Sequence, residues 1–74
     1  MREILIGEVY HHFKGNDYKV LYIATDSETQ EKVVVYESLY DNKVWVRPYE
    51  MFNSLVDTFK YPDIKQKYRF ELKK

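Results

Sequence analysis

The sequence predicts a small β-rich α+β domain: a partly open antiparallel barrel of the SH3-like kind, in the order β-β-β-β-α-β. Three observations predict this fold. Short runs of β-branched and aromatic residues recur between clusters of turn-forming residues. A helical spacing of apolar residues occurs once, after the fourth run. The chain has 74 residues, so we expect a single domain over residues 1–74, and one core that depends on large side chains.

The run at residues 32–40, KVVVYESLY, organises the expected sheet. Val33, Val34 and Val35 are consecutive apolar residues, and neighbours in a strand point to opposite faces. Both faces of this strand are therefore expected to be buried, which is typical of an interior strand. We predict that it forms the middle of a strongly bent sheet.

The remaining strands are expected at residues 8–13, 17–25, 44–47 and 67–73, with the last at an edge of the sheet. Polar turns at residues 14–16, 26–31 and 41–43 join the first four strands as a meander. Residues 1–6 form a leading strand or a packed arm, and Gly7 marks a bend. A flat antiparallel sheet with the helix across one face remains the alternative architecture.

The helix is expected to follow Pro48, whose missing N–H suits a first helical turn. The apolar residues beyond it are spaced along one helical face, at Met51, Phe52, Leu55, Val56 and Phe59. Lys60 places a cation at the C-terminal end, and Pro62 prevents continuation. These signals predict a helix of about three turns.

Short pieces of sequence recur in a recognisable order along the chain. They stand at residues 10–15 (YHHFKG), 18–21 (YKVL), 27–29 (SET), 34–36 (VVY), 39–40 (LY), 45–48 (WVRP), 51–52 (MF) and 69–70 (RF). Their order and spacing resemble DUF1653, a family of short bacterial proteins of unknown function. Asp26 stands where a histidine is expected, and Lys32 where a proline is common. The resemblance implies a small domain and no mechanism.

The charge of the chain is zero overall but unevenly placed. Residues 60–74 hold six Lys/Arg against two Asp/Glu, which gives +4, and residues 1–59 hold six against ten, which gives −4. The absence of cysteine excludes disulfides and thiolate metal sites. No apolar run approaches the roughly 20 residues that span a membrane, so we expect a cytoplasmic protein without membrane contact.

The residues at 45–48, WVRP, are the main binding candidates. If Val44 and Val46 face the core, Trp45 and Arg47 share the opposite face of their strand. Tyr36 and Tyr40 on the adjacent strand are expected on that face too, and Trp, Tyr and Arg are frequent in binding hot spots. The alternative is that Trp45 fills the core while Arg47 pairs with Glu37 or Glu50.

The two histidines, His11 and His12, are adjacent and therefore point to opposite faces of a strand. They cannot jointly hold one ion, so we expect no metal and no cofactor. One histidine is expected against the core and the other in solvent, and His12 is the candidate for function.

These observations predict a noncatalytic binding module with an aromatic and arginine surface formed by Trp45, Arg47, Tyr36 and Tyr40, with His12 and Lys14 nearby. Such a surface is suited to stack a nucleobase, to hold a proline-rich peptide or to receive a cationic group. One alternative is RNA or single-stranded DNA binding through the same face, helped by Lys14, Arg69 and the terminal lysines. Another is an enzyme or enzyme accessory in which His12 works with Glu28 or Glu50. We expect a monomer or a weak dimer through an edge strand.

Overall fold

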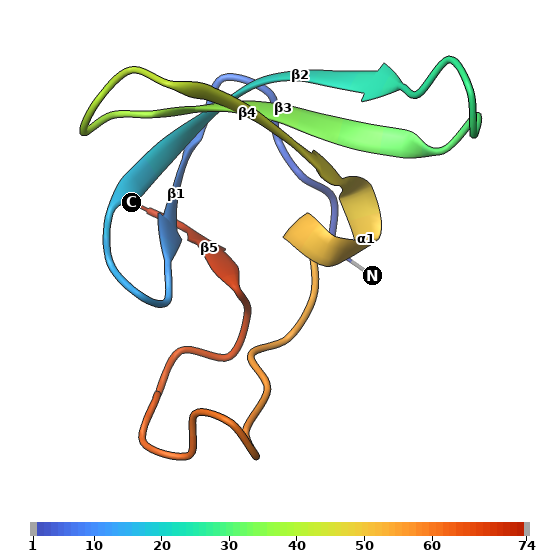
Figure 1. The fold of residues 1–74 in the computed structure, drawn as a ribbon. Coiled ribbons are helices and arrows are strands. Elements are labelled where there is room, and N and C mark those ends of the chain that lie inside the picture. The colour runs from blue at the N-terminus through green and yellow to red at the C-terminus, as the bar shows by residue number, and fades with distance from the viewer. Residues whose placement is uncertain (1, 74) are drawn as a thin grey trace.

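The computed structural model describes residues 2–73 as five antiparallel strands in one sheet with a short helix after the fourth strand (Figure 1). The elements are β1 (Val9–His12), β2 (Asp17–Thr25), β3 (Lys32–Ser38), β4 (Val44–Pro48), α1 (Tyr49–Phe52) and β5 (Phe70–Leu72). The predicted β-β-β-β-α-β order is therefore confirmed.

The strands lie in the order β4-β3-β2-β1-β5, which leaves β4 and β5 as the two edges of an open sheet. The prediction that β3 is an interior strand is confirmed, but the middle position belongs to β2. The edge position of β5 is also as predicted. The register between β2 and β3 shifts between Val20 and Tyr22, and such an irregularity increases the bend of a sheet. The sheet curves around α1 (Figure 1).

The predicted turns form with the expected chemistry. Gly15 and Asn16 adopt φ of 106° and 70° between β1 and β2, and Asn42 adopts φ of 60° between β3 and β4. In the turn between β2 and β3, Asp26 Oδ1 accepts the backbone N–H groups of Glu28 and Thr29 at 2.9 and 3.1 Å. Local side chains and left-handed residues therefore satisfy these turns without tertiary help.

The core lies on the inner face of the bent sheet and is mainly aromatic. Its buried hydrophobic residues are Ile4, Tyr10, Val20, Val34, Tyr36, Phe52, Val56 and Phe70. The rings of Phe52 and Phe70 stack in parallel, with centroids 4.0 Å apart. Residues 2–6 form an arm rather than a strand, and the N–H of Ile4 donates to the Tyr49 hydroxyl at 2.9 Å; Met1 lies outside the described residues.

The outer face of the sheet is more open than the sequence predicted. Val34 is fully buried, but Val33 and Val35 are only half-buried. Val35 pairs with Val46, and Val44 and Val46 remain 57% and 62% exposed. The predictions that both faces of β3 are buried and that Val44 and Val46 face the core are therefore wrong. A single curved sheet has one concave face, so only the side chains on that face of β3 are covered by the core.

The predicted three-turn helix is also wrong, because α1 contains only Tyr49–Phe52. The Ser54 hydroxyl donates to the Met51 carbonyl at 2.7 Å, and polar side chains of this kind compete with helical backbone bonds. Leu55 then forms an isolated bridge with Tyr68. The apolar stripe divides accordingly, with Phe52 buried and Phe59 98% exposed.

Replacement of the stacked ring tests this account of the core. We expect Phe52→Ala to lower the free energy of unfolding by about 3–5 kcal/mol, or to abolish folding, because it leaves a large cavity. The matched variant Phe59→Ala removes the same side chain from a site that is 98% exposed, and we expect a change within about 0.5 kcal/mol. Urea unfolding followed by circular dichroism measures both. Equal losses in the two variants would contradict the assigned core.

Candidate functional site

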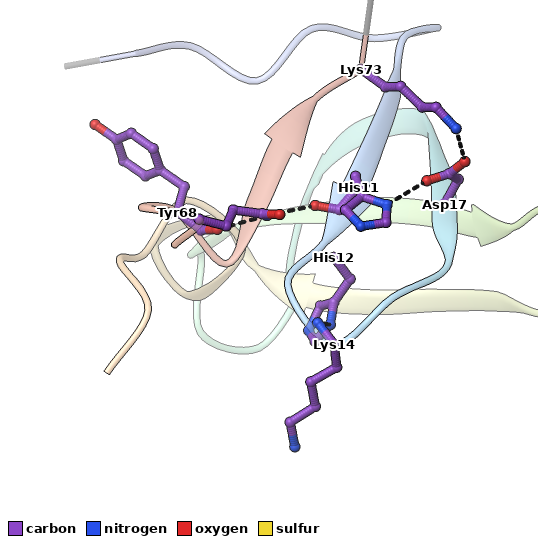
Figure 2. A network of polar contacts seen from close by, with 7 residues as sticks. His11, His12, Lys14, Asp17, Tyr68 and Lys73 are labelled. Carbon is purple, nitrogen blue, oxygen red and sulfur yellow. Dashed lines mark hydrogen bonds and ion pairs between the residues drawn. The ribbon is translucent and has the colours of Figure 1, made fainter. Parts of the chain in front are cut away.

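The two histidines of β1 point to opposite sides of the strand, as predicted (Figure 2). His11 Nδ1 lies 2.7 Å from Asp17 Oδ1, and the other Asp17 oxygen accepts a bond from the Lys73 ammonium. The bonds from Lys73 and His11 lower the pKa of the Asp17 carboxyl. This cluster joins the start of β2 to β1 and to the residue after β5, so it has a structural explanation.

His12 lies on the other side, where Figure 2 shows it beside Lys14. Its Nδ1 accepts the backbone N–H of Lys14 at 3.1 Å, and its ring meets Phe70 edge-on with centroids 4.8 Å apart. Because Nδ1 is the acceptor, a neutral imidazole here carries its proton on Nε2. The tight turn between β1 and β2 therefore fixes both the orientation and the tautomer of His12.

His12 lines a hollow of about 380 Å³, which we call the cation pocket. Four of its lining residues are cations and three carry rings. The full lining is His12, Phe13, Lys14, Arg47, Val56, Asp57, Lys60, Tyr61 and Arg69. The volume falls at the lower end of the range typical of small-molecule sites.

Each of the two arginines of the cation pocket donates a hydrogen bond to a hydroxyl group of a neighbouring residue. Arg47 on β4 donates its Nε–H to the Tyr36 hydroxyl at 3.1 Å, and Arg69 donates its Nε–H to the Ser54 hydroxyl at 3.1 Å. The backbone of Arg69 is fixed too, since its N–H donates to the carbonyl of Ser54 at 2.8 Å and its carbonyl accepts from Phe13 at 3.0 Å. Both side chains therefore approach the pocket from rigid supports.

Asp57 is the one carboxylate among the described residues that line the cation pocket. Its Oδ1 accepts the backbone N–H groups of Phe59 and Lys60 at 3.0 and 3.3 Å. This oxygen is thus used in a local turn. The lining carries four positive side chains against one negative side chain, so the hollow is an electropositive site.

The pKa of His12 is consistent with this excess of positive charge. Burial, followed by the charges of Arg47, Arg69 and Lys14, lowers the pKa of His12 to about 4. The imidazole is therefore neutral near pH 7. Burial disfavours the charged imidazole most, and the nearby cations of the hollow add to that effect.

The chain matches the family model described as "Protein of unknown function (DUF1653)" over residues 8–72. The chain belongs to the DUF1653 family. The resemblance seen in the sequence is thereby confirmed across nearly the whole domain. Comparison with curated proteins and with solved structures gave no match.

Three of the six predicted binding residues of this DUF1653 domain, His12, Lys14 and Arg47, meet in the cation pocket. Tyr36 is only 4% exposed, so it supports Arg47 from the core rather than offering a surface. Trp45 is 48% exposed beside it on β4 and does not line the pocket. Tyr40, 81% exposed, lies in the turn after β3 and outside the pocket.

Arg47 does not form the ion pair with Glu37 or Glu50 that was the alternative interpretation. The ion pairs found within residues 2–73 are those of Asp17 with His11 and Lys73. The exposure of Trp45 likewise argues against its role as a core plug.

Sequence reasoning missed most of the residues from the connection between α1 and β5. The sequence predicted Lys60 at the end of a helix and did not predict a site role for Phe13, Asp57 or Tyr61. Arg69 was predicted to contact a ligand through the nucleic-acid alternative alone. The available signal was the +4 charge of residues 60–74, which marks a basic segment without saying where it folds.

A second hollow of about 700 Å³ lies near α1, and its charges are balanced. Its cations, Arg2 and Lys32, accompany the carboxylates Glu31 and Glu50. The Arg2 guanidinium already donates to Asn53 and to the Phe70 carbonyl, and it lies 3.9 Å from the Tyr68 ring centroid. These contacts already engage the Arg2 guanidinium with protein partners.

Residues 2–73 contain no cluster of three or more His, Cys, Asp or Glu side chains arranged to hold a metal ion. Within the same residues, no helix has the length and apolar character needed to cross a membrane.

A pH titration tests the electrostatics of the cation pocket. We expect the His12 imidazole to titrate near pH 4 by NMR, and Lys14→Gln to raise that pKa by removing a neighbouring charge. An unfolded histidine titrates near 6.5, so the unfolded chain binds more protons between about pH 6.5 and 4. The contribution of His12 to stability is complete above this window and is lost as the pH falls through it.

The variant His12→Gln serves as the control for other acid-sensitive groups. Its unfolding free energy should decline less steeply than that of the wild type between about pH 6.5 and 4. A His12 midpoint at 6.5 or above in the folded protein would contradict the electropositive pocket.

Proposed function

We propose that this protein is a noncatalytic binding module that takes an anionic ligand in the cation pocket. The carrying observation is that Lys14, Arg47, Lys60 and Arg69 line one hollow in which Asp57 is committed to its own turn. Guanidinium groups are well suited to oxyanions, because their planar donors match carboxylate and phosphate geometry. Several cations gathered around one hollow favour an anion more strongly than the same cations spread over the surface, because their attractions to it add.

Two further observations favour binding over acid–base catalysis. His12 is neutral near pH 7 and its Nδ1 is engaged by a backbone N–H. The carboxylates considered as its partners are elsewhere: Glu28 lies in the turn between β2 and β3, and Glu50 lines the second hollow. A general base needs its partner within hydrogen-bond reach, and neither of these residues supplies that geometry.

Trp45 extends the proposed surface beyond the cation pocket. It shares the inner face of β4 with Arg47 and is paired with Tyr36 on β3. Its exposed fraction of 48% leaves the indole partly accessible. We therefore assign Trp45 to the rim, where it would contact the outer part of a ligand.

We keep a cytoplasmic location as part of the proposal. For the oligomeric state we propose a monomer or a weak dimer joined through an edge strand, for which β4 and β5 are the two available edges.

Anion titrations test the proposed function. We expect inorganic phosphate and succinate, added at low ionic strength, to shift the NMR signals of His12, Phe13 and Arg69. Arg47→Gln removes a charged donor and should weaken binding by about tenfold or more. Added salt should weaken binding to the wild type as well.

The matched control is Lys19→Gln, which makes the same charge change at an exposed site on the outer face of β2. It should leave the affinity for both anions unchanged. Because Arg47 also bonds Tyr36, the exposed Lys14→Gln variant tests the pocket without disturbing the core. The proposal fails if neither anion shifts the pocket signals of the wild type, or if Lys19→Gln weakens binding as much as Lys14→Gln.

A further inference from the structure

The cation pocket is lined by positive side chains and by aromatic rings. An anionic ligand accounts for the positive side chains but not for the rings. Phe13 and Tyr61 meet edge-on with centroids 4.9 Å apart, and the His12 ring lies 4.7 Å from Phe13 at a tilt of 31°. These rings form one continuous aromatic side of the hollow. A small inorganic anion would make no use of it, whereas a ligand with a flat ring would.

Two cations lie over the Tyr61 ring of this aromatic side. The Lys14 ammonium lies 5.2 Å from the Tyr61 ring centroid, and the Lys60 ammonium lies 5.6 Å from it. The pKa of the Tyr61 hydroxyl is lowered, chiefly by the Lys14 side chain. An aromatic platform next to positive charges is the arrangement by which proteins hold single nucleotides, stacking the base and neutralising the phosphate.

The hydrogen-bond donors of the pocket suit a phosphate. Arg47 and Arg69 each use Nε–H for a protein partner, and neither forms an ion pair within residues 2–73. Their terminal N–H groups are thus left for an oxyanion. The Nε2–H of neutral His12 adds one more donor. Three donors around one hollow match the several acceptor oxygens of a phosphate better than the two of a single carboxylate.

On the basis of the proposed anion-binding function, we infer that the ligand is a phosphorylated nucleotide unit. Its phosphate lies between Arg47 and Arg69, and its base packs against Tyr61. The same unit exists as a free mononucleotide and as the terminal nucleotide of a single-stranded nucleic acid. Both sources present the chemistry that the pocket recognises.

Titrations of the full 74-residue chain with four probes test this inference. The probes are inorganic phosphate, adenosine, adenosine monophosphate and a short 5′-phosphorylated oligoadenylate. We expect adenosine monophosphate to bind at least about tenfold more tightly than either phosphate or adenosine, because it alone of these three engages both the positive side chains and the rings. Binding is measured by NMR shifts of His12, Phe13 and Arg69.

Two variants separate the roles of the rings and of the positive side chains. Tyr61→Leu removes the aromatic platform and should weaken adenosine monophosphate by about fivefold or more, while inorganic phosphate changes by less than about twofold. Lys60→Gln should weaken the binding of inorganic phosphate and of adenosine monophosphate by similar factors. Lys19→Gln, outside the pocket, should change neither.

The oligoadenylate distinguishes the two sources. Tighter binding than the mononucleotide, with a steeper dependence on salt, would assign the ligand to a nucleic-acid strand. Equal affinity would assign it to a free nucleotide.

The inference is overturned if phosphate and succinate bind but adenosine monophosphate binds no more tightly than phosphate. It is also overturned if Tyr61→Leu weakens the binding of inorganic phosphate and of adenosine monophosphate by the same factor. In these cases the anion-binding function stands. If no anion binds at all, the proposed function fails together with the inference.

Discussion

The stacking of Phe52 on Phe70 is the contact on which the rest of the structure depends. The two rings come from α1 and β5, are 0% and 1% exposed, and lie nearly parallel. Tyr36 meets both of them edge-on, so the stack also ties β3 to the C-terminal segment. In a chain of this size, a few large aromatic rings supply much of the buried apolar area.

The same stack creates the candidate site. Arg69 lies directly before Phe70, and its hydrogen bonds to Ser54 hold it where its side chain lines the cation pocket. The guanidinium carbon of Arg47 lies 5.7 Å from the Phe70 ring centroid. The His12 ring contacts Phe70 edge-on and also contacts Tyr18 edge-on. One buried ring thus organises residues from β1, β4 and the start of β5 into a single positive hollow.

The positive hollow and the neutral histidine have one physical cause. Burial disfavours a charged imidazole, and neighbouring cations disfavour it further. An anion in the cation pocket would cancel part of that field. The arrangement therefore contains unfavourable interactions between like charges, which a ligand of negative charge would relieve.

The sequence by itself determined the features that depend on neighbouring residues. The turn chemistry of Asn16, Asp26 and Asn42 and the opposite directions of His11 and His12 follow from backbone geometry alone. The tertiary structure decided the rest. Residues 54–56 carry a helical pattern, yet pairing with residues 67–69 holds them extended, because tertiary contacts outweigh the small free energies of helix propensity. Sequence spacing likewise could not predict that Arg47, Arg69 and Tyr61 line one pocket, because their proximity depends on how three separate segments pack together.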